Sequence, residues 1–585
     1  MAEKTPNKNQ RQKQATIRIV MMICIIICVN VLASYLHAGL DLTKEKRFSL
    51  SPSTKTMLRN MKEVAVVDVY LKSENKFPAY LQRLQESVRE RLASFKDIAG
   101  TKVVFRFVDP FEGKNDEEKK AVVHDLSNKG IRFFELAQQG DAQYSMQVFF
   151  PFALVQYNGK ELPVMLLEDP PDKTTAEEKI NYAEALLEYK FANAINELGR
   201  PVRARVAYIV GNNEDLGVRT FDLLTSIRRY YDLDTLDLMH TVHIPVAYDA
   251  IIINEPKLTF TGPEKLKIDQ YIMRGGHVLW NVNSLDASID SLERHPPQIM
   301  AMEYGLDLDD LLFKYGVRIN NDLVEDMQNV PLARVVNGGP PELHDWVYFP
   351  KLNPTSEHPI VRNMDFIFGK FTNSIDTLKT SGINKTVLLQ SSKYSRVASA
   401  PVRVSLSMMN FPLTNEMFNK PYRPVAVLLE GKFTSAYKNR LAPEYLRVLD
   451  SLNEPFKATC DSNSSMIVSS VGDLFGNDYT TSSGVLQMGY YKYDHHYYAN
   501  KLFLLNCLQY LTDNSGILES HSKQVKLRLL DGARAKDEKT TWQFVNVGIP
   551  IGIVLVFASC YIFFRKRRYE LKPAAAATKP PKSLS

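Results

Sequence analysis

Two long apolar runs without a charged residue lie near the ends of the 585-residue chain, and they limit its possible folds more than any other feature. The first run, Ile19–Leu36, has 18 residues and the second, Val545–Phe564, has 20. At about 1.5 Å per residue, a helix of either length covers nearly all of the roughly 30 Å hydrocarbon layer of a bilayer. The sequence therefore predicts transmembrane helices at residues 17–36 and 542–564, on either side of one large globular region.

Charge is distributed unevenly about these two runs. Residues 1–36 carry a net charge of +4 and residues 541–585 carry +6, so the total of +6 leaves −4 for residues 37–540. Basic residues beside a span mark its cytoplasmic end, so we expect both tails, residues 1–16 and 565–585, in the cytoplasm. Because the basic excess is confined to the tails, the lipid bilayer is the expected partner and nucleic acid is not.

Each apolar run has an alternative interpretation. The first run could be a cleaved signal peptide that ends near Leu36-His37-Ala38, although it is longer than the ~7–15 apolar residues of most signal peptides. The second run could be a buried core helix. The basic stop sequence Arg565–Arg568, close to the end of the chain, favours a membrane span instead.

Residues 37–200 are predicted to form a first α/β unit outside the cytoplasm. Two β-rich runs, Val64–Leu71 and Val103–Val108, are separated by the helical stretch Tyr80–Ile98, a spacing that fits a βαβ crossover. The β-rich segment Tyr144–Leu167 follows, and then a long amphipathic helix over Ile180–Leu198. The end of this helix sets our domain boundary near residue 200.

Residues 201–515 are predicted to form a second α/β unit of the Rossmann-like, doubly wound type, because strands and helices alternate along it. A polar connector at residues 516–541 is expected to lead from this unit to the second span. The predicted strands are Val202–Val210, Tyr248–Ile253, Val278–Val282, Val387–Gln390, Val425–Glu430 and Met466–Ser470, and the predicted helices are Thr220–Tyr230, Pro263–Arg274 and Asn500–Leu511.

Polar residues follow three of these strands directly. Parallel sheets bind ligands at the carboxyl ends of their strands, so the three loops form a candidate crevice for a small molecule or a glycan. The loops could equally be ordinary strand-to-helix turns, which every fold of this class contains. The candidate ligand-binding residues are Gly211, Asn212, Asn213, Glu214, Asn254, Glu255 and Asn281.

Motifs for several kinds of chemistry are missing from the sequence. It contains no G-x-x-x-x-G-K-[ST], G-x-G-x-x-G, H-E-x-x-H or G-x-S-x-G, so we expect neither an enzyme nor a cofactor. The tyrosine-rich segment Tyr490–Tyr498 contains Asp494, His495 and His496, which could bind a metal. Adjacent histidines point to opposite sides of a strand, which favours an aromatic interface or a packed loop, and we predict no metal site. The apolar pattern around Cys507 favours a buried, unpaired residue, and a disulfide bridge between Cys460 and Cys507 stays open as the alternative.

Seven segments together resemble the GldG family, the gliding-motility-associated auxiliary components of ABC transporters. The resemblance covers most of the chain, but the family's Gly-His-Gly-Glu is Gly211-Asn-Asn-Glu214 here. It implies a Rossmann-like region in the periplasm, anchorage in the inner membrane, an ABC permease membrane subunit as partner and a separate ATPase subunit. The segments are Lys46–Ser51, Val206–Glu214, Ile268–Gly276, Tyr315–Val317, Phe371–Asp376, Val427–Ser435 and Leu527–Asp531.

The favoured function is that of a non-enzymatic, membrane-anchored auxiliary or substrate-binding-type subunit of an ABC transporter complex, associated with gliding motility or another function of the cell envelope. One alternative is an envelope receptor that binds a glycan or peptide without any transporter. A second is an enzyme whose site the motifs do not reveal.

Overall fold

The computed structural model describes residues 49–569, apart from gaps, together with residues 17, 20–25 and 27. The chain divides into two compact units, Met1–Gln524 and Val525–Ser585. Most of the first apolar run and the whole tail of residues 1–16 lie outside the described residues, so the first span and its signal-peptide alternative stay predictions. The gaps are residues 73–76, 129–130, 132, 140–143, 168–175, 201, 336–338, 340, 363, 411–412, 442, 452–453, 482–483, 514 and 523–538.

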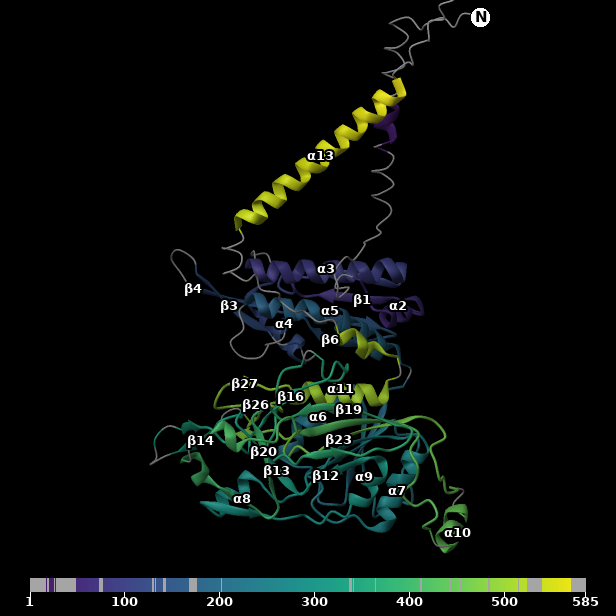
Figure 1. Ribbon diagram of the computed structural model, residues 1–585, viewed down its shortest axis with the longest axis vertical. Helices are drawn as coiled ribbons and strands as arrows, with labels where there is room; N and C mark the ends of the chain where they lie inside the picture. Colours follow the sequence, from purple (N-terminus) through teal and green to yellow (C-terminus); the bar gives the residue numbers. More distant parts are fainter. Residues whose placement is uncertain are drawn as a thin grey trace, which may run out of the picture. The chain divides into compact units, whose positions relative to one another are not determined.

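A four-stranded sheet, in the order β2-β1-β5-β6, organises the N-terminal part of the first unit (Figure 1). Strands β1 (Ala65–Val69) and β2 (Val103–Phe107) are parallel and are joined through helix α3 (Ala79–Ala99), which confirms the predicted βαβ crossover. Strands β5 (Phe152–Tyr157) and β6 (Lys160–Met165) then extend the sheet in antiparallel fashion.

Two long helices pack against each other and against this sheet. Helix α3 buries side chains at steps of three and four, from Leu81 to Phe95, as an amphipathic helix must when it covers a sheet. Phe95 meets Phe191 of helix α5 (Ala176–Gly199) edge to face, with ring centroids 6.4 Å apart. Ile517, from the short helix η5 (Ile517–Ser522), is buried in the same core. The other elements of this part are α2 (Pro52–Arg59), α4 (Asp116–Asn128), β3 (Phe134–Gln139) and β4 (Tyr144–Phe149).

A nine-stranded mixed sheet organises the rest of the first unit, in the order β17-β16-β19-β22-β23-β10-β9-β7-β8. The last five strands in this order are mutually parallel, and the other four are added antiparallel. The parallel strands are β23 (Ser464–Ser469), β10 (His277–Asn281), β9 (Ala250–Asn254), β7 (Arg205–Val210) and β8 (Asp232–Asp237). The others are β17 (Ile367–Phe368), β16 (Lys351–Pro354), β19 (Ile383–Gln390) and β22 (Pro424–Gly431).

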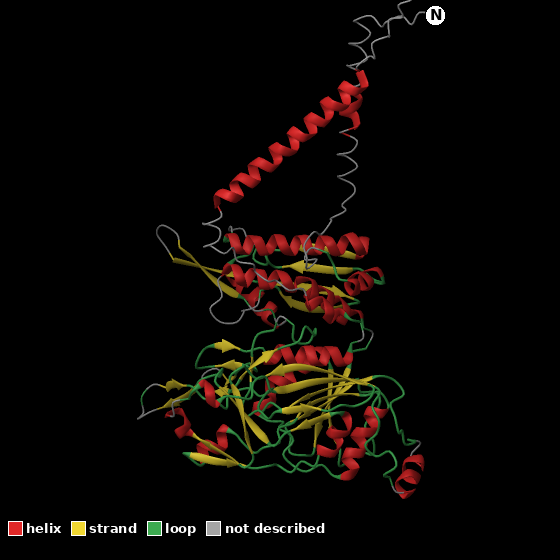
Figure 2. Ribbon diagram, in the orientation of Figure 1, coloured by secondary structure: helices red, strands yellow, loops and turns green. Residues whose placement is uncertain are grey.

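Helices cover both faces of the parallel strands. Successive side chains of each strand point to opposite faces, so each strand contributes to two cores. In β9, Ala250 and Ile252 join a core with helices α6 (Phe221–Tyr230) and α11 (Asn500–Thr512), whereas Ile251 and Ile253 join a core with α7 (Gly262–Met273) and α9 (Asp309–Tyr315). Figure 2 shows the resulting helix, sheet and helix layers. The alternating strands and helices predicted for this region are confirmed, so the fold is mixed α/β.

Strand β8 was not predicted. Its sequence, Asp-Leu-Asp-Thr-Leu-Asp, lies at the edge of the sheet, and none of its side chains is fully buried. An edge strand needs no apolar run, so it lacks the signal that identified β9, where all five residues are buried.

Smaller elements complete the first unit. Six short antiparallel pairs flank the large sheet, among them the hairpin of β26 (Tyr490–Tyr491) and β27 (His496–Tyr497). The helices α8 (Ile289–Arg294) and α10 (Pro443–Ser451) lie in connections between strands. The remaining paired strands are β11 (Gln298–Ala301) with β21 (Val402–Ser405), β12 (Val317–Ile319) with β18 (Ile375–Thr377), β13 (Asp322–Asp326) with β20 (Ser395–Ser399), β14 (Leu332–Val335) with β15 (Pro341–His344), and β24 (Tyr479–Thr480) with β25 (Gly484–Val485).

The second unit is described as one helix, α13 (Lys539–Tyr569), with Pro550 inside it. Its residues Val545–Arg567 are long and apolar enough to cross a membrane by length and composition, and none of that apolar window is buried. Among the described residues it is the one candidate span. Membrane association is therefore supported at the C-terminal apolar run.

Candidate functional site

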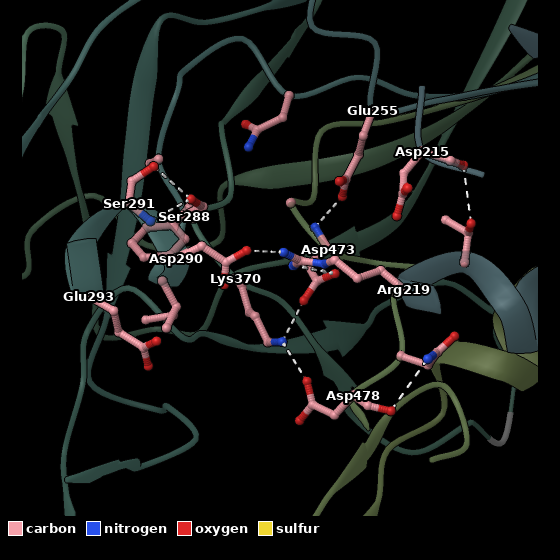
Figure 3. Close-up of a pocket in the computed structure, with 18 of the residues that line it drawn as sticks. Asp215, Arg219, Glu255, Ser288, Asp290, Ser291, Glu293, Lys370, Asp473 and Asp478 are labelled. Carbon is pink, nitrogen blue, oxygen red and sulfur yellow. Dashed lines mark hydrogen bonds and ion pairs between the residues drawn. The ribbon is translucent and has the colours of Figure 1, made fainter. Parts of the chain in front are cut away.

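The carboxyl ends of four neighbouring parallel strands meet at one edge of the large sheet. The chain leaves β7 toward Asn213, β9 toward Glu255, β10 toward Asn283 and β23 toward Asp473. A cavity of about 850 Å³ lies at this edge, and all four of these residues line it. Figure 3 shows Glu255 and Asp473 among its lining residues. Its position agrees with the general rule that open α/β sheets bind ligands outside the carboxyl ends of their strands.

The structure places the seven predicted residues in two groups. Asn213, Asn254 and Glu255 line the cavity. Asn254 is 4% exposed, and its Oδ1 accepts a hydrogen bond of 3.0 Å from Nδ2 of Asn281. Asn281 is itself fully buried and does not line the cavity, so its amide supports the wall from behind.

Gly211, Asn212 and Glu214 lie behind the cavity wall as well. A Cβ at Gly211 (φ +123°) would come within 3.0 Å of Oδ1 of Asp237, so this turn requires glycine for both conformation and space. The N–H of Asn212 donates to Oε2 of Glu214 at 2.8 Å, and both side chains are buried. Burial raises the pKa of Glu214 to about 7, despite the hydrogen bonds that its carboxylate accepts.

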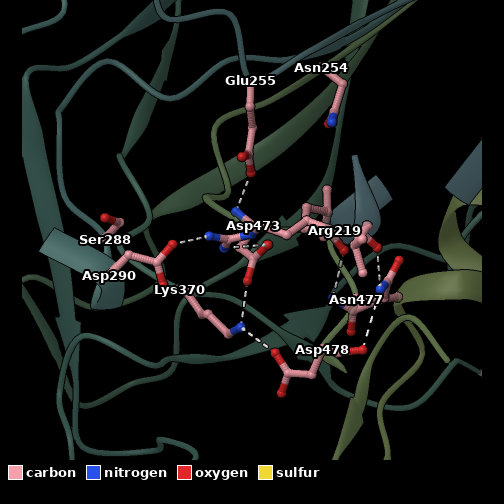
Figure 4. A network of polar contacts seen from close by, with 12 residues as sticks. Arg219, Asn254, Glu255, Ser288, Asp290, Lys370, Asp473, Asn477 and Asp478 are labelled. Carbon is pink, nitrogen blue, oxygen red and sulfur yellow. Dashed lines mark hydrogen bonds and ion pairs between the residues drawn. The ribbon is translucent and has the colours of Figure 1, made fainter. Parts of the chain in front are cut away.

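An ion-pair network that sequence reasoning missed crosses the cavity wall (Figure 4). Asp473 lies at its centre and pairs with Lys370 at 2.5 Å and with Arg219 at 3.3 Å. Arg219 also pairs with Asp290 at 2.7 Å, and Lys370 with Asp478 at 3.8 Å. The network thus joins loops that are up to about 260 residues apart in sequence.

The pKa shifts in this network follow from its charges. Burial alone would raise the pKa of Asp473, but the Lys370 ammonium and the Arg219 guanidinium outweigh burial and hold that pKa below its ordinary value. The pKa of Lys370 is raised, because Asp473 and Asp478 outweigh the effect of its burial. The three side chains are therefore charged at neutral pH.

Glu255 lies next to this network, and among the described residues no cation forms an ion pair with it. Its Oε1 accepts a hydrogen bond from the main-chain N–H of Asp473. Burial, and then the nearby charge of Asp473, raise the pKa of Glu255 to about 7. This carboxyl therefore changes its charge close to neutral pH, unlike an ordinary exposed glutamate.

Four residues that line the cavity have left-handed backbone conformations although none is glycine. Their φ angles are 64° for Asn213, 50° for Glu255, 48° for Phe371 and 53° for Asp473. Such residues cost about 1–3 kcal/mol each and gather at functional sites. Their concentration at one cavity supports this edge of the sheet as the functional site.

The cavity can recognise polar groups. Its wall offers carboxylates, carboxamides and tyrosine hydroxyls, together with the aromatic side chains of Phe349 and Phe371. Carboxylates accept hydrogen bonds, and amides and hydroxyls can both donate and accept them. This arrangement suits the binding and orientation of a polar small molecule.

The signals for the missed residues differ. Asp473 follows β23, which was predicted as a strand, so the rule used for the other three loops would have found it had the pairing of β23 with β10 been known. Lys370 and Arg219 follow no motif, and only the fold brings them to the cavity. No sequence signal could have identified them.

The tyrosine-rich segment forms the β26–β27 hairpin, whose turn lines the cavity through Lys492 and Tyr493. Its histidines have separate partners: Nδ1 of His495 lies 3.1 Å from the Tyr490 hydroxyl, and Nε2 of His496 lies 3.1 Å from Oδ2 of Asp365. In the part of the chain that the structure describes, no three His, Cys, Asp or Glu side chains are grouped to hold a metal. Cys507 is a buried free thiol, as predicted.

Comparisons with solved structures find only weak similarities. The N-terminal domain of mmIFT52 is 15% identical, with a TM-score of 0.30, over 53% of this chain and 97% of that domain. A thua-like protein from Parabacteroides merdae is 11% identical, with a TM-score of 0.24, over 53% of this chain and 90% of that protein. TM-scores this low do not establish a shared fold.

Sequence comparisons cover more of the chain. A Borreliella burgdorferi protein described as an uncharacterized protein is 20% identical over 445 residues, which are 74% of this chain and 80% of the relative. A domain of unknown function, DUF7088, matches residues 44–156. The family model described as an ABC-type uncharacterized transport system matches residues 203–507, more than half of the chain. The protein therefore belongs to this ABC-type transport system family, as an auxiliary component.

Proposed function

We propose that the protein is a non-enzymatic, membrane-anchored auxiliary subunit of an ABC transporter complex and that it binds a polar ligand in the cavity at the carboxyl ends of its parallel strands. Gly211, Asn212, Glu214 and Asn281 support the wall of this Rossmann-like site. Asn213, Asn254 and Glu255 face the ligand, together with Arg219, Lys370 and Asp473.

One observation carries this proposal. The residues that line the cavity run from Asn213 to Tyr493, so the whole cavity lies inside the stretch 203–507 that matches the transport-system family. The part of the chain that defines the family is thus the part that forms a cavity with charged and strained residues. A ligand-binding role in transport accounts for both facts.

The topology is part of the proposal. Basic residues Arg565–Arg568 follow the apolar stretch of α13, which supports a cytoplasmic C-terminus and a periplasmic position for the cavity. With a second span at residues 17–36, both termini would be cytoplasmic and the anchor would lie in the inner membrane. A permease subunit and a separate ATPase subunit would complete the complex, since the sequence has no nucleotide-binding loop of its own. The resemblance to the GldG family supports a role in gliding motility or in another function of the cell envelope.

Copurification from native membranes tests the assignment to a complex. The full-length protein, tagged at its C-terminus and isolated in mild detergent, should bring down a multi-span permease and an ATPase in constant ratio. A matched preparation of an unrelated tagged membrane protein with two spans controls for nonspecific capture. Isolation of the protein without either subunit, together with ligand binding by the protein alone, would favour the receptor alternative.

Cysteine labelling tests the topology. Glu416 is exposed and belongs to the unit that holds the cavity, so a Glu416→Cys variant should react with an impermeant maleimide once the outer membrane is opened. A Lys579→Cys variant should react only after the inner membrane is also broken. Labelling of Lys579→Cys from outside the inner membrane would refute the cytoplasmic C-terminus.

A further inference from the structure

We propose that the ligand of this cavity carries a primary ammonium group, and that this group pairs with the carboxylate of Glu255. The inference rests on the proposed ligand-binding function and names the chemical class of the ligand. Three observations lead to it: the charge balance of the wall, the unused oxygen of Glu255 and an unpartnered amide in the same wall.

The wall of the cavity is acidic overall. It contains seven acidic and five basic side chains. Two of the basic side chains in the wall are already neutralised, because Arg219 pairs with Asp290 and Asp473, and Lys370 pairs with Asp473 and Asp478. An anionic ligand could not use Arg219 or Lys370 without breaking these pairs, whereas a cation would complete the balance of charge.

Glu255 has one oxygen to spare. Its Oε1 accepts the main-chain N–H of Asp473, and no hydrogen bond or ion pair to Oε2 is present among the described residues. Lys257 lies two positions further along the chain, and its charge favours the ionised form of Glu255, but no ion pair between the two is present among the described residues. The left-handed backbone at Glu255, with φ of 50°, and the bond to Asp473 fix the carboxyl group at the cavity wall. The carboxylate is therefore oriented in advance for a donor that the protein does not supply.

A second acceptor lies in the same wall. Asn283 lines the cavity and is 8% exposed, yet its Oδ1 has no hydrogen-bond partner among the described residues. A buried acceptor without a partner costs about 1–3 kcal/mol, which a donor from the ligand would recover. An ammonium group has three N–H donors, so it can donate to more than one acceptor of the wall.

A divalent metal fits this wall less well than an ammonium. Ca²⁺ takes about six to eight oxygen ligands, commonly from several carboxylates. Asp473 is already committed to Lys370 and Arg219, and the described residues contain no group of three His, Cys, Asp or Glu side chains that could hold a metal. Calcium therefore serves as the competing cation in the test.

The protonation state of Glu255 predicts how binding depends on pH. Its carboxyl is neutral below a pKa of about 7, and an ammonium ion would have to displace that proton before pairing with it. Affinity should therefore rise as the pH increases through 7, while an ordinary amine stays charged. The charged and titratable groups that face Glu255 are Asp473, Arg219, Lys257, Tyr208 and Tyr304.

The test uses the purified full-length protein in detergent and ligand-detected NMR. The probes are D-glucosamine and 1,5-diaminopentane, each measured against its N-acetylated derivative, with CaCl₂ as the cation control. We expect the amines to bind and their acetylated forms to bind at least about tenfold more weakly, because a charge-assisted hydrogen bond is lost. Glu255→Gln should weaken amine binding by a similar factor and remove its rise with pH. Glu416→Gln makes the same chemical change at an exposed position that is not among the lining residues and should have no effect.

A second variant separates loss of the contact from loss of the fold. Asn283→Asp keeps the shape of the side chain and adds a carboxylate beside the ammonium, so it should tighten amine binding, which general damage would not do. If acetylated and free amines bind equally, if Glu255→Gln leaves amine binding unchanged, or if Ca²⁺ binds in place of the amines, the ammonium inference is wrong while ligand binding stands. If no probe binds to the wild type, both the inference and the proposed binding function are refuted.

Discussion

Replacement of Asp473 by asparagine should destabilise the protein by about 2–3 kcal/mol. Breaking a buried ion pair from one side costs about 3–5 kcal/mol, because the partner charge is left uncompensated. Two features reduce the cost here: Lys370 keeps Asp478 at 3.8 Å, and the half-exposed Arg219 keeps Asp290 at 2.7 Å. Asparagine preserves the local shape and tolerates the left-handed φ of 53°, so the change isolates the charge.

Thermal unfolding of the full-length protein in detergent would measure this loss. The entropy of unfolding is about 2.1 cal/mol/K per residue, so the unfolding midpoint of a cooperative unit of about 300 residues falls by roughly 1.6 °C for each kcal/mol of stability lost. We therefore expect the midpoint to decrease by about 3–5 °C. The effect should depend on pH in one direction. The pKa of Asp473 is lowered in the folded protein, so its contribution is present above the ordinary aspartate value of about 4 and is lost as the pH falls through the lowered pKa.

The matched control is Asp461→Asn. Asp461 pairs with Lys457, but its side chain is 64% exposed, and exposed pairs contribute about 0–1 kcal/mol. The reasoning about the network would be refuted if Asp473→Asn lowered the midpoint no more than this control does. It would also be refuted if the difference from wild type were as large well below pH 4 as at pH 7.

Three further predictions concern stability and assembly. Burial raises the pKa of Glu214 to about 7, so the folded state loses stability as the pH rises from about 4.5 through 7. In denaturant unfolding, the free energy of unfolding of Glu214→Gln should therefore be about 1–3 kcal/mol higher than that of the wild type at pH 8, but not at pH 5. Leu504 of α11 is fully buried in the core of the large sheet, so Leu504→Ala should cost about 2–5 kcal/mol in the same assay, and a cost under 1 kcal/mol would contradict the packing. Gly548 and Gly552 share one face of α13, and replacing both by leucine should preserve membrane insertion while blocking close helix packing. If the doubly substituted protein copurified with the permease as well as the wild type does, the contact would not lie on that face.

The large sheet could be predicted because its central strands are buried on both faces. Such strands are continuous apolar runs, as in the Ala-Ile-Ile-Ile of β9, and the helices between them show clear end signals, as at Thr261 before α7. An edge strand such as β8 has neither property. Its alternating aspartates are compatible with a loop, and only pairing with β7 makes it a strand.

The site residues that could be predicted are those that lie in the sequence at or just after the end of a predicted strand. Asn213, Asn254 and Glu255 were found because each lies at the carboxyl end of a strand or in the loop that follows it. The ion-pair network could not be found in that way, since Asp473 and Lys370 are 103 residues apart and meet only through the order of strands in the sheet. Pairing across such distances depends on the tertiary fold and leaves no local pattern.

The backbone conformations at this edge of the sheet favour a ligand-binding role for its loops over a role as ordinary turns. An ordinary turn that needs a left-handed residue is best served by glycine, which adopts positive φ without the cost of about 1–3 kcal/mol that other residues carry. Gly211 follows that rule one residue after β7, but the corresponding turns after β9 and β23 hold Glu255 and Asp473 at φ of 50° and 53°. Glycine would adopt these conformations at a lower cost than either carboxylate residue does. The side chains of Glu255 and Asp473 must therefore contribute what glycine cannot, and at this cavity that contribution is charge.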